Sequence, residues 1–251
     1  MGTNEIRIIG LRGLPEIRTG DDLSGLITTS IRDAGLELVA GDVITIAQKV
    51  VSKAEGRTVD LESITVSDRA REWAAMYDKD PRVVEVVLSE SRRIVRMERG
   101  LIISETEHGF VCANAGVDAS NTGEGTVVLL PVDPDGSARR IQAALEQEFG
   151  LRPAVVISDT FGRPWREGLV NVAIGVAGLA PIVDYRGLLD SHGHPLRVTT
   201  IAVADELAAA AELVMGKSDQ VPVAIIRGFD YEARVSSARE LLREAHRDLF
   251  R

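Results

Sequence analysis

Two polar segments of this sequence combine carboxylates with hydroxyl, amide and glycine residues beside apolar runs. Residues 114–125 are dense in Asn, Asp, Ser and Gly, so they offer oxygen ligands for a hard cation and backbone amides for a phosphate. Residues 158–168 directly follow an apolar run, and ligands gather at the carboxyl ends of strands in many α/β folds. Asp159 and Thr160 in this second segment could hold a divalent ion.

Each segment also has a plainer structural interpretation. Residues 114–125 could be a solvated turn cluster, and residues 158–168 a capped turn with surface arginines. Alternatively, Arg163 and Arg166 could neutralise phosphate or carboxylate oxygens. A third segment, residues 48–57, again follows an apolar run; Lys53 within it could reach a nucleotide phosphate or lie in a surface turn.

The tripeptide Gly216-Lys217-Ser218 resembles the end of a P-loop. That motif needs Gly-x-x-x-x-Gly-Lys-Ser between a strand and a helix. Position 211 is Ala211, and the residues before Gly216 have a helical pattern, so we reject a P-loop. Contact with a nucleotide by another geometry stays open.

The sequence offers little support for zinc or for nucleophilic catalysis. His192 and His194 flank a glycine in a polar turn, and the chain has four histidines and one cysteine, so a zinc site is disfavoured. Cys112 lies in an apolar run, which favours a buried core residue over a nucleophile. A single cysteine also excludes an intrachain disulfide framework and fits a reducing compartment.

Short apolar runs and amphipathic stretches must position these groups. The runs rich in Val and Ile predict strands at residues 43–47, 127–130, 154–157, 198–203 and 223–226. Capping residues and periodicity predict helices at residues 22–34, 67–77, 81–89, 137–149, 205–215 and 237–250. Residues 94–130 and 169–203 have the pattern of consecutive strands. The class is therefore α/β or α+β with mixed or antiparallel sheets, not a Rossmann or P-loop fold.

Composition limits the partners. The net charge is −9 and no Lys/Arg block exceeds two residues, so nucleic-acid binding is not expected. The N-terminus lacks the apolar core of a signal peptide, and no apolar stretch is long enough to span a membrane. We expect a cytoplasmic protein with no membrane contact. We also expect one domain over residues 1–251, in which no boundary between subdomains can be assigned.

A series of motifs in register carries a family resemblance. They are Gly13-Leu14-Pro15-Glu16-Ile17 with Gly20-Asp21-Asp22-Leu23, Val51-Ser52-Lys53-Ala54-Glu55-Gly56-Arg57, Asn114-Ala115-Gly116-Val117-Asp118-Ala119-Ser120-Asn121, Leu130-Pro131 with Asp133-Pro134-Asp135-Gly136-Ser137-Ala138, Ser158-Asp159-Thr160-Phe161-Gly162-Arg163, Ala204-Asp205-Glu206, and Met215-Gly216 with residues 222–228. In their order and spacing they resemble the coenzyme F420-0:L-glutamate ligases, also called γ-glutamyl ligases.

The resemblance implies roles for individual residues. Asp118 and Asp159 would hold one divalent ion, and Thr160 would lie at a second ion. Catalytic roles would fall to Asp118, Asp159 and Lys53. The implied nucleotide contacts are Leu14, Pro15, Glu16, Ile17, Gln48, Lys53, Asn121, Gly216, Lys217, Ser218 and Asp219.

The resemblance also implies the reaction and the assembly. The enzyme would use GTP to form an amide between L-glutamate and coenzyme F420-0 through an acyl phosphate, with two Mg²⁺ or Mn²⁺ ions and K⁺ as a further candidate ion. It would be an intertwined homodimer of two-part subunits, and the ligase alone, without the flavin reductase domain that some members carry. One departure is Lys217, because some members have an acidic ligand of the second ion there. The alternatives are a carboxylate–amine ligase for another acid and a nucleotide sensor; the pair Asp118 and Asp159 argues against the sensor.

Overall fold

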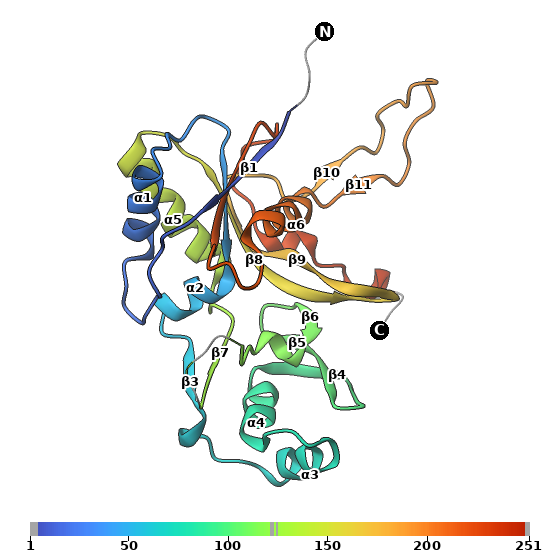
Figure 1. The fold of residues 1–251 in the computed structure, drawn as a ribbon. Coiled ribbons are helices and arrows are strands. Elements are labelled where there is room, and N and C mark those ends of the chain that lie inside the picture. The colour runs from blue at the N-terminus through green and yellow to red at the C-terminus, as the bar shows by residue number, and fades with distance from the viewer. Residues whose placement is uncertain (1–4, 121–122, 124, 249–251) are drawn as a thin grey trace.

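A five-stranded mixed sheet lies at the centre of the computed structural model, which describes residues 5–120, 123 and 125–248 (Figure 1). Its strand order is β1-β12-β2-β8-β9. The strands are β1 (Arg7–Leu11), β12 (Val223–Arg227), β2 (Val43–Ala47), β8 (Ala154–Arg163) and β9 (Arg166–Ala177). Only the β2–β8 pair in this sheet is parallel. The predicted mixed sheet is therefore confirmed.

Helices cover both faces of the sheet, which explains why β2 is apolar at all positions but Thr45. Ile44 and Ile46 of β2 pack on the side of α1 (Leu23–Asp33), α2 (Gln48–Ala54) and α5 (Pro134–Phe149). Val43 packs on the opposite side, against α6 (Val203–Met215). Successive side chains of a strand point to opposite faces, so a strand covered on both faces favours apolar residues at nearly every position.

Helix α5 approaches β9 very closely at Gly175. Asp133 caps the helix by accepting a hydrogen bond from Gly136 N (2.9 Å), and Pro134 stands in the first turn. A Cβ atom built on Gly175 would lie 2.5 Å from the carbonyl oxygen of Pro134. Glycine at this position is what lets the first turn of α5 lie on the strand.

The elements between residues 58 and 128 pack around their own apolar clusters, at the bottom of Figure 1. They are α3 (Asp68–Tyr77), α4 (Pro81–Ser89), the antiparallel pair β3 (Thr58–Asp60) and β7 (Thr126–Val128), and a sheet of β4 (Ser91–Glu98), β5 (Leu101–Thr106) and β6 (Val111–Ala113). Trp73, Val84 and Ile102 are buried between the helices and this sheet. The consecutive strands predicted within residues 94–130 are confirmed.

Three sequence predictions need correction. The expected strand at residues 198–203 contains only β11 (Thr200–Ile201), because Val203 begins α6; β11 pairs with β10 (Val183–Asp184) at the base of a projecting arm. The strand predicted at residues 154–157 extends to Arg163, so residues 158–168 form the outer half of the β8–β9 hairpin and not a capped turn. The expected helix at residues 237–250 is, within the described residues, two short 3₁₀ turns, Ala238–Leu241 and Ala245–Arg247.

The reason for the last correction lies at the start of the segment. Asp135 of α5 accepts hydrogen bonds from Ser237 Oγ (2.5 Å) and Ala238 N (3.0 Å), and Leu242 has extended backbone and packs against the main core. These contacts favour an extended chain over a helix. No helix among the described residues is long and apolar enough to cross a bilayer.

Candidate active site

Asp118 is the first group of the candidate site, and its position is fixed by β7. Asp118 N donates to Val128 O (2.9 Å) and Val128 N donates to Asp118 O (2.8 Å). The Asp118 carboxylate accepts from Ser120 N (2.6 Å) and pairs with Lys49 Nζ (2.7 Å) at the start of α2. Lys49 Nζ also donates to Ser120 O (2.6 Å). An ammonium thus stands among oxygens where a metal cation could bind.

Asp159 is the second group, and within residues 5–120, 123 and 125–248 its carboxyl forms no ion pair like that of Asp118. On β8 it shares a face with Ile157 and Phe161. Burial raises the pKa of Asp159 to about 6, a backbone hydrogen bond from Thr160 opposes this, and the charge of Asp118 adds to it. Burial also acts to raise the pKa of Asp118, but hydrogen bonds from Lys49 and Ser120 outweigh it and hold that pKa below its usual value.

A second polar network lies on the opposite face of β8, beside α6. Thr160 Oγ1 donates to Asn171 Oδ1 (2.6 Å) and accepts from Lys217 Nζ (2.5 Å). Lys217 Nζ lies 3.0 Å from Glu212 Oε1, and Asn171 Nδ2 donates to Glu212 Oε2 (2.8 Å). Neighbouring residues of one strand, Asp159 and Thr160, therefore serve two polar clusters.

The residues predicted to contact a nucleotide lie around α2 and at the end of α6. Lys53 Nζ is 3.4 Å from Glu16 Oε1, so α2 and the segment before α1 meet there. Gln48 is buried and accepts from Ser52 Oγ (2.8 Å), while Ile17 is buried in the main core. Lys49 and Lys53 are four residues apart on α2 and share a face, which connects this region with Asp118.

The remaining predicted contacts differ in exposure. Leu14 is half-buried and packs against the main core, whereas Pro15 is exposed. Gly216, which ends α6 at a φ of 59°, and Lys217, Ser218 and Asp219 are exposed. Asn121 lies outside the described residues.

Comparison with known proteins identifies the family. A family model described as F420-0:Gamma-glutamyl ligase matches residues 12–228, which include every predicted site residue. The chain belongs to the F420-0:gamma-glutamyl ligase family. It is therefore a ligase.

Relatives of this ligase match along nearly their whole length. The coenzyme F420:L-glutamate ligase of Methanothermobacter thermautotrophicus is 49% identical over 98% of this chain and 99% of its own. The protein of the same name from Methanopyrus kandleri is 47% identical over 94% of both chains. That of Methanocaldococcus jannaschii is 43% identical over 98% of this chain and 97% of its own.

Three site residues of the ligase were not identified from the sequence. The sequence contained an indication for Lys49, because this residue adjoins Gln48 and precedes Lys53 by four positions. Only a prediction that residues 48–54 are helical would have placed the two lysines on one face. Asn171 and Glu212 meet Thr160 through the register of β8 with β9 and the packing of α6. Neither relation is visible in the chain's linear order.

Other candidates have structural roles. The Arg163 guanidinium donates to Glu167 O (2.5 Å) and Gly168 O (3.2 Å) within the hairpin turn. His192 and His194 lie on the projecting arm, where their backbone N–H groups donate to Asp190 Oδ1.

Cys112, the single cysteine of the ligase, is not placed to act as a nucleophile. Cys112 is buried, as predicted; burial and the charge of Asp159 raise its pKa to about 12, so it is a thiol at neutral pH. Among residues 5–120, 123 and 125–248, no group of three His, Cys, Asp or Glu side chains is arranged to hold a metal. A metal held by Asp118 and Asp159 would therefore take its remaining ligands from groups other than the described His, Cys, Asp and Glu side chains.

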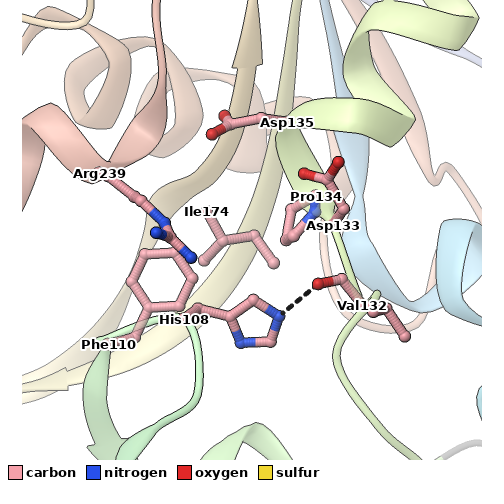
Figure 2. A pocket seen from close by; sticks show the side chains of 8 residues that line it. All are labelled: His108, Phe110, Val132, Asp133, Pro134, Asp135, Ile174 and Arg239. Atoms are coloured by element: carbon pink, nitrogen blue, oxygen red, sulfur yellow. Dashed lines mark hydrogen bonds between the residues drawn. The ribbon is translucent and has the colours of Figure 1, made fainter.

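A cavity of about 130 Å³ lies where the C-terminal segment meets α5 (Figure 2). His108 stacks on Phe110, and its Nε2 lies 2.8 Å from Pro131 O and 3.2 Å from Val132 O. Arg239 reaches over the cavity from the C-terminal segment. Phe110, which lines the cavity, makes an edge contact with Phe161, two residues from Asp159. The cavity therefore adjoins the candidate site.

Proposed function

We propose that this ligase joins L-glutamate to coenzyme F420-0 by a γ-glutamyl amide bond and uses GTP to activate the acceptor. The substrates follow from the description of the family and the names of the relatives. One structural observation supports the chemistry: Asp118 and Asp159 lie close enough for their charges to interact, beside the ammonium of Lys49. Two carboxylates that hold a divalent ion, with a lysine beside them, would offset the repulsion among anionic substrates.

We propose that Asp118 and Asp159 hold a divalent ion, Mg²⁺ or Mn²⁺. Carboxylate oxygens are the ligands that these ions prefer. The residues fit such an ion, because two carboxylates face the single ammonium of Lys49, which leaves a net negative charge, and because burial keeps water from solvating the carboxyl of Asp159. When bound, the ion would neutralise charge on the nucleotide phosphates. A second ion at Thr160 and a further K⁺ stay predictions.

The reaction has two steps in this proposal. A carboxylate oxygen of the acceptor attacks the γ-phosphorus of GTP, the bond to the β-phosphate oxygen breaks, and GDP leaves with that electron pair. The glutamate amine then attacks the carbonyl carbon of the acyl phosphate, loses a proton and displaces inorganic phosphate. Lys53, held near Glu16, would stabilise negative charge on the transferred phosphoryl group.

We also propose an intertwined homodimer of two-part subunits. The separate apolar clusters of residues 58–128 support two parts. Large apolar side chains on the arm between β10 and β11 support a dimer, since Leu189 is 67% and Val198 86% exposed. The arm projects far from the central sheet in Figure 1, as a segment that embraces a second subunit would.

The test is to mix the purified protein with GTP, Mg²⁺ or Mn²⁺, L-glutamate and coenzyme F420-0 and to analyse products by mass spectrometry. We expect a product heavier by one or more glutamyl units, with GDP formed in step. Omission of the acceptor is the control, and nucleotide turnover without it would contradict activation of the acceptor by GTP. If GTP and metal bind but no product forms, the acceptor is a different acid.

A further inference from the structure

The ammonium of Lys217 occupies the point at which a cation near Thr160 would bind. Its Nζ lies 2.5 Å from Thr160 Oγ1, 3.0 Å from Glu212 Oε1 and 3.5 Å from Asn171 Oδ1. A hydroxyl, a carboxylate and an amide oxygen are a ligand set suited to a hard divalent ion. All three oxygens are directed at the lysine instead.

The chain around Lys217 holds the ammonium in this place. Gly216 ends α6, and its N–H donates to Glu212 O (3.0 Å), so the next residue is turned back toward the last turn of the helix. Asn171 donates to the second oxygen of Glu212 (2.8 Å), which orients that carboxylate toward the lysine. Because Asn171 contacts both Thr160 and Glu212, the ammonium that joins these two residues completes a closed network.

A divalent ion and this ammonium exclude each other. An ammonium makes three hydrogen bonds, and the network supplies three oxygen acceptors. A divalent ion at the same oxygens would lie within a few ångströms of a positive charge, and like charges at such distances repel. Glu212 is the one carboxylate among these oxygens and the ammonium already neutralises it, whereas two carboxylates face the ammonium of Lys49 at the first site. The positive charge of Lys217 also acts on Asp159, so it serves the same electrostatic purpose as an ion bound there.

We infer that Lys217 takes the place of the second divalent ion, so that this enzyme works with one divalent ion per subunit, held by Asp118 and Asp159. The inference rests on the metal proposed for those two aspartates. It concerns the number of ions and not the identity of the acceptor, so it can be tested without a ligase assay.

The experiment counts Mn²⁺ bound per subunit in the presence of GDP, by titration calorimetry and by the electron paramagnetic resonance of bound Mn²⁺. For the wild type we expect one ion with the spectrum of an isolated centre. Lys217→Glu replaces the ammonium with a carboxylate beside Thr160 and Glu212, so it should bind a second ion. The number of bound Mn²⁺ ions and the integrated intensity of their spectrum should then be twice those of the wild type.

The variant should fold, since the Lys217 side chain is 63% exposed. Lys217→Asp, with a shorter side chain, is the second variant, and Arg71→Glu on the distant helix α3 is the charge-matched control, expected to bind one ion. Two ions in the wild type, or one ion in both Lys217 variants, would overturn the inference. No bound ion in the wild type would overturn it together with the metal proposal, while leaving the family assignment in place.

Discussion

At the scale of single residues, the carboxylate of Asp118 is the group on which most of the proposed chemistry depends. It joins the segment before β7 to Lys49 and would share one ion with Asp159. Its backbone, not its side chain, makes the hydrogen bonds that tie the loop to Val128. A substitution that removes the side-chain charge at position 118 should therefore leave the backbone hydrogen bonds to Val128 in place.

We predict that Asp118→Asn lowers ligase turnover about 100-fold or more and leaves the protein folded. A metal ion contributes several kcal/mol to stabilising phosphoryl transfer, which corresponds to a rate change of this size. Turnover is measured as GDP and amide product, and folding by the thermal midpoint. Asp68→Asn, an exposed site on α3, is the matched control, and unchanged turnover in Asp118→Asn would refute the metal assignment.

We predict that the affinity for Mn²⁺ alone falls about tenfold per pH unit below about pH 6. Only the carboxylate form of Asp159 binds a metal, and its pKa of about 6 means that a proton competes below that pH. Above pH 6 the affinity should level off, because Asp159 is already ionised and Asp118, with its lowered pKa, does not titrate there. Titration without nucleotide keeps phosphate groups out of the measurement, and equal affinity at pH 7 and pH 5 would contradict the prediction.

At the scale of elements, the contact of α5 with β9 predicts a strong effect of one methyl group. Gly175→Ala places Cβ 2.5 Å from Pro134 O, so the helix or the strand must shift, and overpacking of this kind costs about 1–3 kcal/mol. Gly162→Ala in the same hairpin is the control, because its nearest neighbour would be 4.0 Å away. Guanidinium unfolding measures both, and equal midpoints would show that the packing can relax.

Asp135 connects α5 with the C-terminal segment and with β9. It accepts from Val176 N (2.8 Å) as well as from Ser237 and Ala238. We predict that Asp135→Ala lowers the free energy of unfolding by about 2 kcal/mol, because it leaves these donors without their acceptor. Glu72→Ala, exposed on α3, is the control, and hydrogen exchange at Ala238 should rise only in the Asp135 variant.

The sequence predicted most elements because local signals and tertiary packing agree in them. Asp22, Ser67 and Asp80 cap α1, α3 and α4 as their residue types suggest. Prediction failed where distant contacts decide the backbone. Residues 237–248 have helical periodicity, but Asp135 and the core hold them in another path.

In the candidate site, Asp118 and Asp159 were predictable, but Lys49, Asn171 and Glu212 were not. Asp118 and Asp159 stand in polar motifs after apolar runs, and these motifs carry the family resemblance. Lys49 and Asn171 belong to the site only because α2 lies beside residue 118 and β9 pairs with residue 160. Such pairings depend on topology, which no local pattern encodes.

At the scale of the whole molecule, the projecting arm predicts assembly. We expect a mass in solution twice the 27.1 kDa of the chain, measured by light scattering after size-exclusion chromatography. Leu189→Asp combined with Val198→Asp should yield monomers, because charges would replace apolar contacts. Met76→Asp, equally exposed but on α3 at the opposite end of Figure 1, should stay dimeric. A monomeric wild type would refute the assembly.

The pairing of Lys49 with Asp118 has a consequence for the life of the protein in the cell. A carboxylate that already has a cationic partner needs no metal for the chain to fold, so synthesis and loading of the proposed metal would be separate events. A shortage of metal would then leave a reserve of intact, idle enzyme. Activity could return as soon as the ion is supplied, without new protein synthesis.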